Sequence, residues 1–375
     1  MNASPPSFVA AHAVDDDWGR AVKACGDGLG TLPDGANLGF VYASDQFAGD
    51  LGSIVTYLRQ TTGIEDWVGS LGVGIVSGAD GYFDESALAV MVGAFADGDF
   101  RILPTLDKDL DQMAADDRAW IDATEPTFAI VHGDPTNDRT PALVDSLAES
   151  AAGFLVGGLT SSRGAHHQVA GDVTDGGLSG VLFAPTVDVA TSLSQGCTPM
   201  AETHIITDCQ DNVLMSLDGR PALEVFKEDI GELLAHDLQR VAGYVHAALP
   251  IEGTDTGDYT VRSLVAIDPE RGFLAIGAAV QPGERVLFVR RDPASAIEDM
   301  QAMLDRLKRR LDGPPAGGVY FSCLARGPNM FGSADLEMSM IRDTLGDFPV
   351  VGFFGEGEIS NCRLYGYTGV LAVFI

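Results

Sequence analysis

The sequence predicts an α/β fold of two domains, in which mixed β-sheets are flanked by helices. At 375 residues the chain is long enough for two buried cores. Apolar, β-branched segments alternate with amphipathic segments of helical period, which is typical of α/β proteins. A strand–helix–strand–strand unit also recurs three times, and its glycine-led strand pairs indicate mixed rather than wholly parallel sheets.

Regular structure is expected to begin only after a polar N-terminal stretch. Residues 1–36 are expected to form an extension with one short helix, which Asp16 or Asp17 could cap. The domain boundary is placed near residues 185–205, where the strand pattern pauses. The two domains are then residues 37–195 and 196–375.

Each copy of the repeated unit begins with an apolar strand that leads through a loop into a helix. A Val-Gly turn follows, and then a strand pair. The opening strands are expected at Leu38–Ser44, Thr127–Pro135 and Gly317–Pro328. The helices are expected at Asp50–Gln60, Ala142–Ala151 and Ala334–Leu345. The closing strands are expected at Ala87–Phe95, Gly176–Ala184 and Tyr365–Phe374.

Different material lies between the second and third copies. Residues 204–223 predict a hairpin that turns near Asp211–Asn212. Apolar residues at helical spacing predict a helix over Ile230–Leu249. Residues 262–291 are expected to form a three-stranded meander, and a further helix is expected after Asp292, which would cap it.

The charge balance narrows the classes of partner. The chain carries 23 Lys and Arg against 54 Asp and Glu, a formal net charge of −31. This argues against nucleic acid and against an anionic membrane surface, because both attract clustered cations. No signal segment and no apolar run of about 18 residues is found, so a cytoplasmic protein is expected. The five cysteines form no CxxC pair, which argues against a structural zinc site.

The signatures of common enzymes are absent. No P-loop, HExxH or GxSxG motif occurs. No catalytic residue is therefore predicted, and the chain is not expected to be an enzyme. The alternative is a cysteine-dependent enzyme with Cys323 as nucleophile and Glu358 as base, although a small buried residue is the simpler interpretation of Cys323.

The third copy holds the residues best suited to a ligand. Cys323 and Arg326 follow an apolar strand, while Glu356, Glu358 and Asn361 lie in the glycine-rich loop of the last strand pair. Ligands of open α/β sheets bind outside the carboxyl ends of the strands. Arg326 could hold a carboxylate or phosphate there, and the opposing carboxylates and amide could read amines. The structural alternative is an ion pair of Arg326 with Glu356 or Glu358 that joins two loops.

His166 and His167 form the one histidine pair. Adjacent side chains of a strand point to opposite faces, so the two cannot easily chelate one metal, and no metal site is predicted. One of them could still be an axial ligand to haem, whereas a solvated loop pair is the simpler interpretation.

These segments resemble the FIST family of two-domain sensory proteins. The resemblance spans residues 39–375 and rests on FLVGGLTSSRG and GGLSGVLF in the N-terminal half. In the C-terminal half it rests on DGRPALEVF, VYFSCLARGPNMFG and VVGFFGEGEISNCRLYGYTGVLAVF. It implies an N-terminal ligand-sensing domain over residues 37–195 and a C-terminal FIST domain over residues 196–375. The ligand-binding residues that it implies are Cys323, Arg326, Gly355, Glu358, Gly157 and Gly158, with Thr160 and Ser161 from the same motif.

The resemblance implies a bacterial sensor of signal transduction that binds a small, amino-acid-like metabolite. A stand-alone sensor is expected, because no output domain is recognised, and it would signal to a separate histidine kinase or cyclase. The alternative is a haem-binding nitric oxide sensor, since some relatives are reported to bind haem. The sequence leaves the identity of the ligand, haem binding and a homodimer open.

Overall fold

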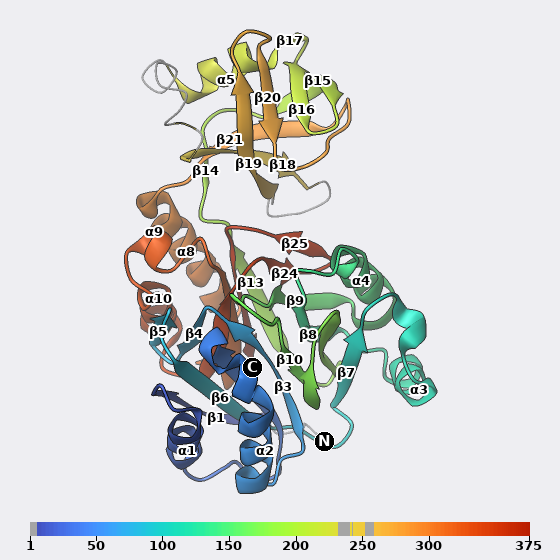
Figure 1. Cartoon of the computed structure of the whole chain (residues 1–375), viewed down its shortest axis with the longest axis vertical. Helices are drawn as coiled ribbons and strands as arrows, with labels where there is room; N and C mark the ends of the chain where they lie inside the picture. Colours follow the sequence, from blue (N-terminus) through green and yellow to red (C-terminus); the bar gives the residue numbers. More distant parts are fainter. Residues whose placement is uncertain (1–5, 232–240, 242, 252–258) are drawn as a thin grey trace. The chain divides into compact units, whose positions relative to one another are not determined.

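Two compact units make up the chain in the computed structural model, which describes residues 6–231, 241, 243–251 and 259–375 (Figure 1). The first unit runs to Ser194 and resumes at Met300, and the second is Gln195–Asp299. The first unit is therefore discontinuous, and it joins the third copy of the repeat to the first two. Mixed sheets with flanking helices confirm the predicted α/β class.

Among the described residues, the first unit contains three six-stranded sheets, one for each copy. In each sheet the opening strand pairs in parallel with the second strand and antiparallel with the closing strand. The opening strands are β2 (Ala36–Ser44), β8 (Phe128–Gly133) and β22 (Gly317–Cys323). The second strands are β3 (Asp66–Gly72), β9 (Phe154–Leu159) and β23 (Val350–Gly355). The closing strands are β6 (Ala87–Ala94), β12 (Leu178–Phe183) and β26 (Gly369–Phe374).

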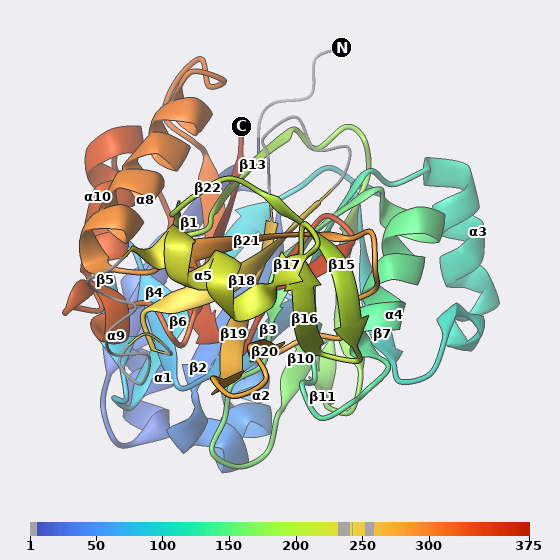
Figure 2. The same ribbon diagram turned by 90° about the horizontal axis from the view of Figure 1, so that it is seen from above.

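An edge strand borders each closing strand, and a pair of helices covers the outer face of each sheet (Figures 1 and 2). The edge strands are β1 (Ser7–Val14), β7 (Phe100–Leu106) and β13 (Val189–Ser194). The helix pairs are α1 (Trp18–Leu29) with α2 (Leu51–Thr62), α3 (Ala115–Thr124) with α4 (Thr140–Leu147), and α8 (Pro293–Lys308) with α10 (Leu336–Leu345). Shorter helices are η1 (Asp45–Asp50), η2 (Leu110–Gln112), η3 (Ala148–Ala152) and α9 (Pro328–Phe331).

The N-terminal stretch corrects one expectation and confirms another. Strand β1 already begins at Ser7 and pairs antiparallel with β6 along its whole length. The polar N-terminal extension was therefore wrong in its first half. Asp17 caps α1 as expected, since its carboxylate accepts a hydrogen bond from the backbone N–H of Arg20 at 2.9 Å.

Each copy also contributes a short hairpin to the sheet of another copy. The hairpin of the first copy pairs with β23, that of the second with β3, and that of the third with β9. This cyclic exchange makes each sheet incomplete without a neighbouring copy, so the three copies form one folding unit. The hairpins are β4 (Gly74–Ser77) with β5 (Asp80–Phe83), β10 (Gln168–Ala170) with β11 (Asp172–Thr174), and β24 (Glu358–Ser360) with β25 (Arg363–Tyr365).

The three copies meet at one ring from each opening strand. The centroids of Tyr42 and His132 are 5.6 Å apart, and each lies 6.0 Å from that of Phe321. Tyr42 Oη lies 3.1 Å from His132 Nε2. Burial lowers the pKa of His132 to about 3, so this imidazole is neutral and belongs to the core.

Gly157 shows why Val-Gly pairs recur in the three copies. It lies within β9, and a Cβ atom there would stand 1.8 Å from the carbonyl oxygen of Val131. Gly69 and Gly352 occupy the matching positions of β3 and β23, with 1.7 Å to the nearest carbonyl oxygen. The expected Val-Gly turn is therefore wrong: the glycine marks a close strand contact that admits no side chain.

The second unit is a closed antiparallel sheet. Its strands follow the order β14-β21-β15-β16-β20-β19-β18, β18 pairs back with β21, and β17 pairs with β16. Helix α5 (Ala222–Ile230) packs on its core. The strands are β14 (Thr198–Pro199), β15 (His204–Gln210), β16 (Val213–Leu217), β17 (Arg220–Pro221), β18 (Val245–Pro250), β19 (Tyr259–Asp268), β20 (Phe273–Ile276) and β21 (Arg285–Arg290).

Ring closure explains two wrong predictions in this unit. The expected helix Ile230–Leu249 is wrong from Val245 on, where strand β18 begins, and its residues 232–240 and 242 lie outside the described part. The expected meander is broken, because β20 pairs with β19 and β16, whereas β21 pairs with β14, β15 and β18. The hairpin that turns at Asp211–Asn212 is confirmed.

No helix within the described residues is long and apolar enough to cross a membrane.

Candidate functional site

Two glycine-rich segments of distant sequence lie side by side in the first unit. Strand β24 pairs with β9, which sets Glu358 opposite Gly158. The N–H of Leu159 donates to the carbonyl of Gly357 at 2.8 Å. A Cβ on Gly355 would lie 2.8 Å from the carbonyl oxygen of Leu159. The structure therefore brings together the predicted residues Gly157, Gly158, Gly355 and Glu358.

Glu358 is a fully buried carboxyl group beside these glycines. Its Oε2 accepts hydrogen bonds from the backbone N–H and the hydroxyl of Thr368 at 3.1 and 2.7 Å. Its Oε1 has no hydrogen-bond partner of standard geometry among the described residues. Burial raises the pKa of Glu358 to about 8, although the Thr368 bonds, the charge of Arg326 and the thiol of Cys323 oppose that rise.

Arg326 lies in the same part of the unit but has a different partner from the two that the sequence suggested. Its Nε and Nη2 atoms each lie 2.8 Å from Oε1 of Glu337 in α10, and both side chains are 1% exposed. Glu337 also accepts from the hydroxyls of Tyr320 and Ser322. The expected pair of Arg326 with Glu356 or Glu358 is wrong in its partner, while its role of joining two segments holds.

Sequence reasoning missed Glu337, although a signal was present. Glu337 lies one turn before Ile341 on the buried face of α10. A carboxylate on the apolar face of a helix needs a buried cation or donors, because an unpaired buried charge is costly. The cation is Arg326, which follows strand β22 and forms the ion pair with Glu337.

Thr160 and Ser161 use their hydroxyl groups to join the three copies. Thr160 Oγ1 lies 2.8 Å from Ser70 Oγ. Ser161 Oγ accepts from the N–H of Val73 at 2.8 Å and donates to the carbonyl of Phe354. Both residues are fully buried. They lie close to the glycine-rich pair of strands, with their hydrogen bonds already made inside the protein.

Glu356 and Asn361 stand apart from this buried group. The side chain of Glu356 is 40% exposed, and its Oε1 lies 3.8 Å from His166 Nε2. Asn361 is exposed in the turn between β24 and β25 with a positive φ of 58°, and its N–H donates to the carbonyl of Leu155. The structure therefore does not gather these two residues with Glu358 and Cys323.

His166 and His167 each face a carboxylate through one ring nitrogen. His166 faces Glu356, and His167 Nδ1 lies 3.4 Å from Asp175 Oδ2. A carboxylate beside one ring nitrogen leaves the other nitrogen available to a metal, so haem binding by either histidine stays a prediction.

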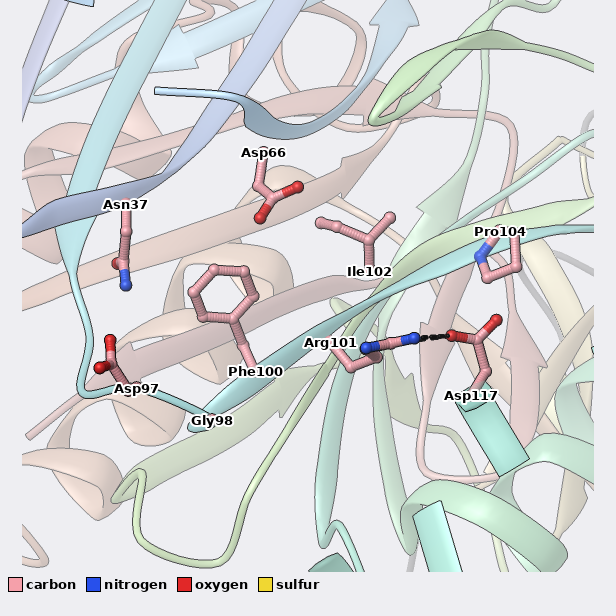
Figure 3. A pocket seen from close by; sticks show the side chains of 9 residues that line it. All are labelled: Asn37, Asp66, Asp97, Gly98, Phe100, Arg101, Ile102, Pro104 and Asp117. Carbon is pink, nitrogen blue, oxygen red and sulfur yellow. Dashed lines mark hydrogen bonds and ion pairs between the residues drawn. The ribbon is translucent and has the colours of Figure 1, made fainter. Parts of the chain in front are cut away.

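An open cavity of about 490 Å³ lies elsewhere on the first unit, beside β7 (Figure 3). Nothing in the sequence pattern marked it. It is lined by Asn37, Asp66, Asp97, Gly98, Phe100, Arg101, Ile102, Pro104 and Asp117.

Known proteins resemble the chain over most of its length. Residues 37–220 match the model of the FIST N domain, and residues 222–361 match that of the FIST C domain. An uncharacterized protein of Mycobacterium tuberculosis (strain H37Rv) is 33% identical over 332 residues, which cover 82% of this chain and 83% of the relative. An uncharacterized protein of Mycobacterium bovis is 35% identical over 218 residues, which cover 54% of this chain and 55% of the relative. The chain therefore belongs to the FIST family, whose domains point to sensory signal transduction.

Proposed function

We propose that the chain is a bacterial sensor that binds a small, amino-acid-like metabolite at Glu358 and its neighbours Cys323 and Thr368. One observation carries this proposal: a fully buried carboxyl group with one oxygen, Oε1, that no described residue satisfies with standard geometry. Buried polar groups are almost always hydrogen-bonded, so an exception of this kind needs a reason. A ligand that supplies the missing donor is such a reason.

The chemistry of Glu358 favours a ligand that carries an ammonium group. Its raised pKa means that a large share of the carboxyl groups hold a proton at neutral pH. An ammonium group beside it would favour the carboxylate, so binding would release that proton to solvent. The guanidinium of Arg326 is engaged by Glu337 and would act on the ligand through its charge only.

Burial of Glu358 also suggests how occupancy becomes a signal. A ligand reaches a fully buried group only when the protein opens, so it selects a state that differs from the closed one. Hairpin β24–β25, which carries Glu358 and docks on another copy's sheet, is the element whose docking the ligand would change. A separate histidine kinase or cyclase would read that change.

Thermal unfolding with a panel of amino acids and related metabolites tests the proposal. A ligand at about 100 times its Kd stabilises the native state by about 2.7 kcal/mol, which raises the melting temperature. We expect a hit with the wild type and with Glu356→Gln, the exposed neighbour that serves as matched control. Glu358→Gln should respond at least tenfold more weakly (about 1.4 kcal/mol). The proposal is wrong if Glu358→Gln responds like the wild type, or if the wild type responds to no metabolite.

A cysteine-dependent enzyme is less well supported. Reactive thiolates are favoured beside cations, whereas the neighbour of the Cys323 thiol is the Glu358 carboxyl. Cys323 is also 7% exposed. The sensory nature of the FIST family agrees with a binding role.

A further inference from the structure

The cavity beside β7 combines an apolar wall with carboxylates that lack partners. Phe100, Ile102 and Pro104 alternate along β7 and form the apolar wall. Figure 3 shows Asp66 reaching toward this wall from the first residue of β3. The volume of about 490 Å³ suits a small organic molecule.

Some polar side chains of the cavity have hydrogen-bond or ion-pair partners inside the protein, and others do not. Arg101 is engaged by Asp117, with its Nη2 2.7 Å from Asp117 Oδ1. The amide of Asn37 is engaged by the backbone N–H and carbonyl of Phe95, both at 3.0 Å. The side chains of Asp66 and Asp97 make no hydrogen bond or ion pair with the described residues. Three carboxylates and one guanidinium leave a net charge of −2 on the lining.

The backbone holds Asp66 in place, but its carboxylate forms no ion pair with a described residue. Its strand pairs in parallel with β2, where Asp66 stands opposite Leu38, so the backbone fixes its position. Partial burial raises its pKa, the charge of Glu65 adds to the rise, and the charges of Arg59 and Arg101 oppose it only in part. The folded protein therefore keeps a carboxylate where it is less stable than in water. A bound cation would relieve that cost.

The threefold repeat supplies an internal comparison. A matching groove lies beside edge strand β1, where Ala10 and His12 face the start of β23. Gly69 and Gly352 occupy matching positions of β3 and β23, and Pro349 precedes Gly352 by the same number of residues as Asp66 precedes Gly69. Pro349 therefore takes the place in that groove that Asp66 has in the cavity beside β7. The smaller cavity there, about 340 Å³, has only Asp347 as a lining carboxylate. The acidic lining thus belongs to one groove and is not required by the repeat.

We propose that the cavity beside β7 is a second binding site, for a small organic cation whose ammonium group meets Asp66 and whose apolar body lies on Phe100 and Ile102 (Figure 3). This site is separate from the group around Glu358 and does not depend on the function proposed for it.

Calorimetric titration with 2-phenylethylamine tests the site, because this probe has an ammonium group and an aromatic body but no carboxylate. The wild type should bind it in the millimolar range or tighter, while 2-phenylethanol, the uncharged analogue, should bind at least tenfold more weakly. Asp66→Asn should weaken amine binding about tenfold or more, and Asp347→Asn, in the smaller groove beside β1, should leave it unchanged.

Thermal unfolding of the free protein adds a readout that a structural role of Asp66 would not give. Removal of a carboxylate that burial disfavours should leave the melting temperature of Asp66→Asn equal to or above that of the wild type. The proposal is overturned if the amine does not bind the wild type, if 2-phenylethanol binds equally well, or if Asp66→Asn binds the amine unchanged. A lowered melting temperature with lost binding would also overturn it, since Asp66 would then be structural.

Discussion

Replacement of Arg326 by alanine should strongly destabilise the first unit. Both partners of the Arg326–Glu337 ion pair are 1% exposed. Without the guanidinium, Glu337 remains buried with the hydroxyls of Tyr320 and Ser322 and the N–H of Gly327 as donors, but with no cation. Removal of one member of a buried pair costs about 3–5 kcal/mol. That is a large part of the total stability of about 5–15 kcal/mol expected for a native protein.

Urea unfolding followed by tryptophan fluorescence measures this loss. Trp18, Trp67 and Trp120 are the three tryptophans of the chain, and all lie in the first unit, so their signal reports its unfolding. The matched control is Arg342→Ala, whose exposed pair with Asp343 should contribute less than about 1 kcal/mol.

A double substitution tests the physical reason. Arg326→Met with Glu337→Gln removes both charges and should recover at least half of the loss, because buried pairs replaced by neutral side chains often cost little. The reasoning is refuted if Arg326→Ala costs less than about 1 kcal/mol, or if the double variant is no more stable than the single one.

Three further substitutions test other parts of the structure. Gly157→Ala should lower the free energy of unfolding in urea by more than about 3 kcal/mol, because its Cβ would stand 1.8 Å from a carbonyl oxygen. The control is Gly52→Ala, within α2 and with open space around it, which should be neutral or stabilising by up to about 1 kcal/mol. In the second unit, His204 Nδ1 and Nε2 lie 2.6 and 2.8 Å from carboxylate oxygens of Asp218 and Asp229, and these bonds raise its pKa despite partial burial. The stabilisation that His204 gives is therefore complete below its unfolded pKa and is lost as pH rises through its folded pKa. His204→Gln should reduce the change of melting temperature with pH in that range. An unchanged profile of melting temperature against pH would contradict this. Burial raises the pKa of Glu358 to about 8 in the folded state, so its contribution to the free energy of unfolding falls as pH rises from about 4.5 to 8. Glu358→Gln should therefore gain stability relative to the wild type across that window. A difference in stability that stays constant with pH would refute the raised pKa.

Local patterns in the sequence predict the repeated unit, while its assembly depends on long-range contacts. The opening strands, the helices after them and the Val-Gly pairs follow from apolar periodicity and matching motifs. The exchange of hairpins does not, because a strand of three or four residues has no periodicity that selects its partner. In the second unit, Val245 to Leu249 fit a helical spacing equally well, and only closure of the sheet makes them a strand.

The candidate site likewise combines residues that the sequence predicts with residues that only the structure identifies. Glu358, Cys323 and the glycines were predicted because they lie in distinctive motifs. Glu337, Thr368 and Asp66 were not, since each gains its importance from a partner far away in sequence. Arg326 illustrates the difference: the sequence marks it as important, and only the structure identifies its carboxylate as that of Glu337.

The most direct test of a sensor that acts through Glu358 is native mass spectrometry after incubation with a bacterial metabolite extract. The wild type and Glu356→Gln should each carry one small molecule per chain, and Glu358→Gln should carry little or none. The same spectra report whether the protein is a monomer or a dimer. Equal loading of Glu358→Gln and the wild type, or no bound molecule on any of the three proteins, would contradict the account.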